Sequence, residues 1–101
     1  MAKDTVLFQN VLAQMGSNLI ETVDLSNQAL TLQDMKDLAN ALRTNISVQE
    51  LELGGNAIDD AGITALANAL GENTTLLHLF LRNNGSTMIS QAIDTLIFTF
   101  V

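Results

Sequence analysis

The sequence predicts an α/β solenoid in which three strand–turn–helix units stack side by side behind an N-terminal capping helix. Two observations lead to this fold class. The same uneven spacing of apolar residues recurs with a fixed period, as at Val23, Leu51 and Leu79, which indicates a repeat architecture. Within each unit the apolar period changes from two to about 3.6 residues, so a strand is followed by a helix. Units this small cannot bury their apolar faces alone. We therefore expect a short parallel three-stranded sheet on the inner face and helices on the outer face.

The first segment of each unit has the pattern of a short strand. The middle unit contains VQELELGGNAI (48–58), and the segments one period before and one period after it repeat its apolar spacing. Apolar side chains at alternate positions face one side of a strand, here the side that meets the helices. These core positions are Val23 and Leu25, Leu51 and Leu53, and Leu79 and Leu81.

The second segment of each unit has the spacing of an amphipathic helix. Thr31, Asp59 and Thr87 precede the expected helices at the same position of each unit. Their side-chain oxygens accept hydrogen bonds from the free N–H groups of a first helical turn, and Asp34 completes a capping-box pair with Thr31. The apolar stripes comprise Met35, Leu38, Ala39 and Leu42 in the first unit and Ile63, Leu66, Ala67 and Leu70 in the second.

The chain, 1–101, is expected to form a single domain. Residues 1–17 form the capping helix, which ends near Gly16. The last unit is irregular, because the helical pattern of the second unit carried forward by one period places Gln91 and Asp94 at apolar positions. The repeats span 18–45, 46–73 and 74–101, and the stripe of the capping helix comprises Leu7, Phe8, Val11, Leu12 and Met15.

The pattern L-x-x-L-x-L-x-x-N-x-L, followed by helices that read LANALRTN (38–45) or LANALGEN (66–73), resembles the leucine-rich repeats of the ribonuclease-inhibitor-like class. It is also similar to the repeat domain of tropomodulin-type proteins. The resemblance covers about residues 18–87. It implies the solenoid fold but no particular partner, because this scaffold serves many. Gln28 stands where the later units have Asn56 and Asn84, so we expect a weaker side-chain-to-backbone ladder in the first unit.

Composition excludes several classes of function. A formal charge of −7 with only four Lys and Arg residues argues against nucleic acid and anionic membrane surfaces, which cationic side chains bind. No stretch approaches the roughly 20 apolar residues of a membrane-spanning helix, and the N-terminal segment does not have the pattern of a secretory signal. The chain contains no cysteine, which suits a cytoplasmic location and leaves no thiolate for metal or redox chemistry. We expect no cofactor.

Three asparagines match the N-glycosylation pattern, namely Asn45, Asn73 and Asn84. They could accept glycans in a secreted protein. Asn45 and Asn73 are one period apart, however, and a structural position in the repeat explains this pair more simply.

Catalytic and metal chemistry have one candidate pair. The repeat places His78, the only histidine, one strand away from Glu50, at about the 5 Å spacing of neighbouring strands. A metal site would need three or four ligands to converge on a nearly flat sheet, so a surface pair is the favoured interpretation. Gly54 and Gly55 lie at a strand-to-loop corner and indicate a turn, because a phosphate loop would open directly onto a helix. We expect no enzymatic activity.

The side chains that alternate with the core leucines form the inner, helix-free surface. This surface is acidic on the first two strands and presents an aromatic ring on the third. An aromatic anchor surrounded by carboxylates favours a protein partner with a basic surface. The alternative is that these positions are simply solvated and that the C-terminal segment covers Phe80. The predicted protein-binding residues are Asp24, Glu50, Glu52, His78, Phe80 and Arg82.

The C-terminal segment TLIFTFV (95–101) has no charge and is rich in branched and aromatic side chains. It is interpreted in three ways: as a cap over the last repeat, as an interface that forms a homodimer, or as the cut end of a longer solenoid. The second interpretation makes the chain a structural or self-assembling protein. Its self-association residues are Ile93, Leu96, Ile97 and Phe100.

Overall fold

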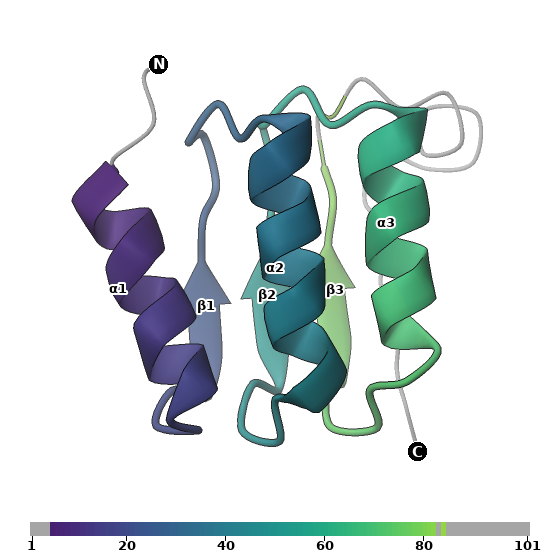
Figure 1. Cartoon of the computed structure of the whole chain (residues 1–101). Coiled ribbons are helices and arrows are strands. Elements are labelled where there is room, and N and C mark those ends of the chain that lie inside the picture. The colour runs from purple at the N-terminus through teal and green to yellow at the C-terminus, as the bar shows by residue number, and fades with distance from the viewer. Residues whose placement is uncertain (1–4, 83, 85–101) are drawn as a thin grey trace.

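The computed structural model describes residues 5–82 and 84. Helices form one layer and strands form the other, and the helices stand side by side in front of the sheet (Figure 1). The elements in chain order are α1 (Thr5–Gly16), β1 (Thr22–Asp24), α2 (Leu32–Thr44), β2 (Glu50–Glu52), α3 (Asp60–Leu70) and β3 (His78–Phe80). This arrangement confirms the predicted α/β solenoid with its N-terminal helix.

The sheet is parallel, and its strands follow the order β1-β2-β3. Each strand residue pairs with the residue at the same position of the next unit, so equivalent residues of successive units stand directly beside one another. Hydrogen bonds continue the pairing past the strand ends, from Leu25 N–H to the Glu52 carbonyl and from Leu53 N–H to the Phe80 carbonyl, at 2.9 and 2.8 Å. The three rungs are Thr22–Glu50–His78, Val23–Leu51–Leu79 and Asp24–Glu52–Phe80.

The core lies between the sheet and the helices. The middle rung of the sheet is fully buried, and it meets the apolar stripes of α2 and α3 as the alternation predicted. Helix α1 closes the N-terminal end with Phe8, Val11 and Met15, while Leu7 and Leu12 pack against the same core from its margin. The fully buried large side chains include Leu25, Leu38, Leu42, Leu51, Leu53, Leu66, Leu76, Leu79 and Leu81.

Side-chain caps fix the points at which α2 and α3 begin. The Thr31 hydroxyl accepts from Asp34 N–H at 3.1 Å, and the Asp34 carboxylate accepts from Thr31 N–H at 2.9 Å. Asp59 accepts from Gly62 N–H at 3.0 Å. These bonds satisfy N–H groups that have no partner inside a helix, which confirms both predicted caps. Thr87 lies outside the described residues.

The apolar stripe of α3 differs from the prediction at two positions. Ala67 is exposed, whereas Ala39, its equivalent in α2, is buried. Leu70 is only half-buried, although its equivalent Leu42 is fully buried. The physical reason is that α2 contacts a helix on each side, α1 and α3, while α2 is the only described helix that packs on α3.

Asn56 ties the first and second units together at the carboxyl ends of the strands. Its amide group donates to the carbonyls of Leu25 and Leu53 at 2.8 and 2.9 Å, and its Oδ1 accepts from Gln28 N–H at 2.9 Å. Asn84 makes the equivalent bonds from the third unit to the second: its amide group donates to the Leu53 carbonyl at 3.0 Å, and its Oδ1 accepts from Asn56 N–H at 3.1 Å. Each amide therefore bonds backbone in two adjacent units.

Gln28 makes a weaker local contact. Its Nε2 donates to the Ser26 carbonyl of its own unit at 3.4 Å. Among the described residues β1 is the first strand of the sheet, so no earlier strand offers the carbonyl to which the later amides donate. The weaker ladder expected at this position stays a prediction.

A second pair of asparagines ties the units together at the amino ends of the strands. The Asn73 amide donates to the carbonyls of Leu42 and Asn45 at 2.7 and 3.1 Å, and Asn45 donates to the Met15 carbonyl at 2.9 Å. Both side chains are buried, with 4% exposed. Neither amide is therefore accessible as a glycan acceptor in the folded protein, and the structural interpretation is confirmed.

Among the described residues, none of the helices has the length and apolar character needed to cross a membrane. The predicted self-association residues, Ile93, Leu96, Ile97 and Phe100, lie outside the described residues, as does most of the irregular last unit.

Replacing Asn56 with alanine tests the ladder. Asn56→Ala removes the partners of buried backbone groups in two units, so the free energy of unfolding should fall by about 2 to 4 kcal/mol. Urea denaturation followed by circular dichroism measures the change. Asn40→Ala, at an exposed position of α2, is the matched control and should stay within about 0.5 kcal/mol. Equal effects of the two substitutions would contradict the ladder's role.

Candidate functional site

The face of the sheet opposite the helices carries the predicted site. In each strand the middle residue is buried and its two neighbours point to the other side, with burial decreasing toward β1. The parallel register places Asp24, Glu52 and Phe80 on one rung and Thr22, Glu50 and His78 on another. These are the side chains that alternate with the core leucines, as the strand pattern predicted.

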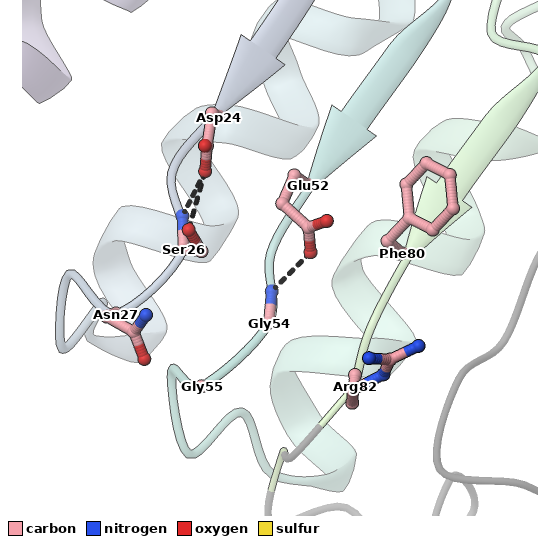
Figure 2. A pocket seen from close by; sticks show the side chains of 8 residues that line it. All are labelled: Asp24, Ser26, Asn27, Glu52, Gly54, Gly55, Phe80 and Arg82. Carbon is pink, nitrogen blue, oxygen red and sulfur yellow. Dashed lines mark hydrogen bonds between the residues drawn. The ribbon is translucent and has the colours of Figure 1, made fainter.

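An open hollow of about 490 Å³ lies at the carboxyl ends of the strands. Figure 2 shows the two carboxylates and the Phe80 ring standing around it, on three neighbouring strands. Its lining comprises Asp24, Ser26, Asn27, Glu52, Gly54, Gly55, Phe80 and Arg82.

Gly54 creates the floor of this hollow. It stands between Ser26 and Arg82 in the repeat alignment, and it contributes no side chain to the centre of the face. A Cβ atom at this position would lie 3.1 Å from Glu52 Oε1 and 3.2 Å from the Arg82 carbonyl oxygen. Any larger residue would therefore press on the carboxylate that borders the hollow.

Both carboxylates are held by the backbone two residues further along. Asp24 Oδ1 accepts from Ser26 N–H at 3.0 Å and from the Ser26 hydroxyl at 2.6 Å. Glu52 Oε1 accepts from Gly54 N–H at 3.1 Å (Figure 2). One oxygen of each group is thereby fixed, which orients the other oxygen without neutralising the charge.

His78 and Glu50 lie together on the rung below the hollow. Nδ1 of His78 is 3.9 Å from Oε1 of Glu50, and the two side chains are 39% and 51% exposed. Among residues 5–82 and 84, no three side chains of the His, Cys, Asp and Glu types converge to hold a metal ion. The geometry shows an exposed pair.

Phe80 differs from the prediction of an exposed aromatic, because its side chain is half-buried. Its ring stacks on that of His78, with centroids 6.3 Å apart and an interplanar angle of 20°. Residues two apart on a strand share a face, so the imidazole covers one side of the ring. His78 is not among the residues that line the hollow.

The corner at Gly54 and Gly55 is a turn, as predicted. Gly55 has a φ of 69° and Asn27, its equivalent, has a φ of 55°, a left-handed conformation that glycine and asparagine adopt most readily. Gly55 N–H donates to the Arg82 carbonyl at 2.8 Å, so the turn also belongs to the hydrogen-bond ladder.

The structure divides the predicted site residues between two places. Asp24, Glu52, Phe80 and Arg82 line the hollow, whereas Glu50 and His78 lie on the rung beside it. Four further residues line the hollow outside the predicted binding set: Ser26, Asn27, Gly54 and Gly55. A signal for them was present, because Asn27 and Gly55 share a repeat position and Gly54 alone leaves a gap in its column.

Two curated proteins illustrate the relatives of this chain. Ribonuclease inhibitor from Sus scrofa is 41% identical over 51 residues, which cover 50% of this chain and 11% of the inhibitor. NACHT, LRR and PYD domains-containing protein 14 from Mus musculus is 34% identical over 93 residues, covering 80% of this chain and 9% of that protein. The chain thus spans only about a tenth of the length of these relatives.

Two solved structures share the fold. The actin-binding site 2 of leiomodin-1 superposes with a TM-score of 0.73 at 26% identity, covering 78% of this chain and 47% of that one. The C-terminal domain of Caenorhabditis elegans tropomodulin superposes with a TM-score of 0.71 at 16% identity, covering 79% of this chain and 50% of that one. The regular repeat, the strand register and these similarities together show that the chain has a leucine-rich-repeat fold, similar to that of the ribonuclease-inhibitor-like class.

One family model, described as a putative vitamin uptake transporter, matches residues 60–101. The match covers less than half of the chain and does not assign it to that family. The described part of the matched range forms α3 and β3, which belong to the repeat stack.

Replacing Gly55 with alanine tests the turn beside the hollow. The left-handed backbone costs a residue with a Cβ about 1 to 2 kcal/mol, and the new Cβ would also displace the Asn27 side chain. Gly55→Ala should lower the free energy of unfolding by about 1 to 3 kcal/mol in urea denaturation. Gly16→Ala is the matched control, since nothing lies within 4 Å of its added Cβ. An equally small effect of both substitutions would rule out the strained turn.

Proposed function

We propose that this protein is a non-enzymatic interaction module that binds a protein partner through the inner face of its sheet. The binding residues are Asp24, Glu50, Glu52, His78, Phe80 and Arg82, and the partner presents a basic surface. One observation carries the proposal: the parallel register sets the carboxylates of β1 and β2 beside a half-buried phenylalanine of β3, on the side without helices.

Charge supports a basic partner. The face carries three carboxylates, Asp24, Glu50 and Glu52, against one guanidinium, and the whole chain has a formal charge of −7. A field of one sign accelerates the approach of an oppositely charged protein and disfavours partners of like charge. Phe80 adds the apolar contact that anchors such interfaces.

Similar proteins support a binding function. One is named an inhibitor of ribonuclease, and one solved structure is titled as an actin-binding site. These names refer to interactions with other proteins. Because this chain shares their fold, we propose the same type of function for it. The cytoplasmic location expected from the sequence stays a prediction.

Charge reversal on β2 tests the binding face. A partner is isolated from the source cell with the intact chain as bait, and its affinity is then measured by titration calorimetry. Glu50→Lys combined with Glu52→Lys should weaken binding by at least about 10-fold, since each exposed ion pair contributes up to about 1 kcal/mol and each reversal also adds repulsion. Phe80→Ala should weaken it independently.

The matched control is Asp37→Lys combined with Glu72→Lys, which makes the same change in net charge on the helical layer. Glu72 pairs with Arg43 at the exposed surface, so its loss should cost little stability. Affinity that falls equally in both double variants would show a general charge effect. Affinity unchanged in the β2 variant and in Phe80→Ala would reject the inner face.

The second candidate function is structural. We propose as the alternative that the chain self-associates at its C-terminal end through Ile93, Leu96, Ile97 and Phe100, forming a homodimer. Exposed Ala67 and half-buried Leu70 favour it, because their equivalents in α2 are covered by neighbouring helices.

Sedimentation velocity at micromolar concentration tests the homodimer. The alternative predicts a dimer that Ile97→Glu combined with Phe100→Glu dissociates or unfolds, because charges enter an apolar interface. Glu52→Lys on the inner face is the control and should leave the dimer intact. A monomer of the unmodified chain would reject self-association.

A further inference from the structure

We infer that the hollow bordered by Asp24, Glu52 and Phe80 receives the guanidinium group of an arginine side chain from the protein partner. This inference rests on the proposed function and deepens it, since it names the group that the inner face recognises. The hollow, of about 490 Å³, is open on one side, so a single long side chain can enter while the rest of the partner stays outside.

The carboxylates supply the charge and the free acceptors. Asp24 and Glu52 stand side by side on one rung, and each uses one oxygen to bond the backbone two residues on. Within the part of the chain that the structure describes, Asp24 Oδ2 and Glu52 Oε2 accept no hydrogen bond. A planar donor group that bridges the two would meet acceptors that are already held in fixed positions. Little conformational entropy of these side chains would then be lost on binding.

Phe80 supplies a flat apolar wall. One side of its ring stacks on His78, and the ring itself borders the hollow. A guanidinium stacks on an aromatic face more readily than an ammonium does, because it is planar and weakly hydrated. Carboxylates on one side and a ring on the other therefore favour arginine over lysine.

Arg82 is the cationic residue at the edge of the hollow. It borders the hollow, and its charge disfavours a second cation nearby. Figure 2 shows its guanidinium turned to the side of β3 away from Asp24 and Glu52. The lining of the hollow thus contains two carboxylates and one cation, which leaves it with a net negative charge.

The experiment is a titration of the ¹⁵N-labelled full chain with N-acetyl-arginine amide, followed by two-dimensional NMR. We expect saturable shifts at the amides of Gly54, Gly55 and Phe80, with a millimolar dissociation constant. N-acetyl-citrulline amide has the same shape without the charge, and it should bind at least about 10-fold more weakly. N-acetyl-lysine amide should fall between the two.

Two variants locate the site without removing the fold. Glu52→Gln keeps an oxygen for Gly54 N–H but loses the charge, and it should weaken arginine amide binding about 10-fold. Phe80→Leu should weaken it about 3-fold. Glu21→Gln, an exposed residue that does not line the hollow, is the control and should change nothing.

Shifts that centre elsewhere, or that citrulline reproduces, would overturn the inference. Equal binding of the lysine compound would overturn the preference for arginine. These results are separable from the proposed function: a partner that is lost on reversal of Glu50 and Glu52, while arginine amide leaves the hollow unperturbed, would retain the binding face and reject the arginine site.

Discussion

The structure depends on asparagine side-chain amides, each of which forms hydrogen bonds with backbone groups in two adjacent units. Asn56 and Asn84 do so at the carboxyl ends of the strands, and Asn45 and Asn73 do so at the amino ends of the strands. Buried backbone groups in the loops need such partners, because water cannot reach them. With the spacing between units fixed at both ends, the strands have one register, in which each residue stands beside its equivalent in the next unit.

That register determines the face that we propose for binding. It sets Asp24, Glu52 and Phe80 in one row, and it puts Gly54 at the centre of the next row, where the absent side chain leaves a hollow. The carboxylates border this hollow with one oxygen each tied to backbone. The leucines that alternate with them are fully buried, so the core side and the inner face of the sheet are separate. Substitutions on the inner face can therefore leave the core intact.

Much of this arrangement was predictable from the sequence, because residues at equivalent positions of successive repeats pair with one another in the sheet. The strands, both helix caps, the capping helix and the columns of the inner face follow from apolar spacing that recurs at a fixed period. The stacking of His78 on Phe80 was not predicted, although the two residues lie two apart on one strand and therefore share a face. The exposure of Ala67 was also missed, because the repeat pattern assumes a neighbouring helix on each side. Predicting the hollow would have required the observation that Gly54 lies between the larger residues Ser26 and Arg82 of the neighbouring strands.

Chemical-shift mapping of the labelled chain in complex with a purified partner tests the central claim most directly, because it locates the contact surface without any substitution. The account predicts that perturbed amides cluster on β1, β2 and β3 and in the turns at Asn27 and Gly55, with α2 and α3 unchanged on their exposed faces. Perturbations concentrated on the helical layer, with the strand residues silent, would contradict it.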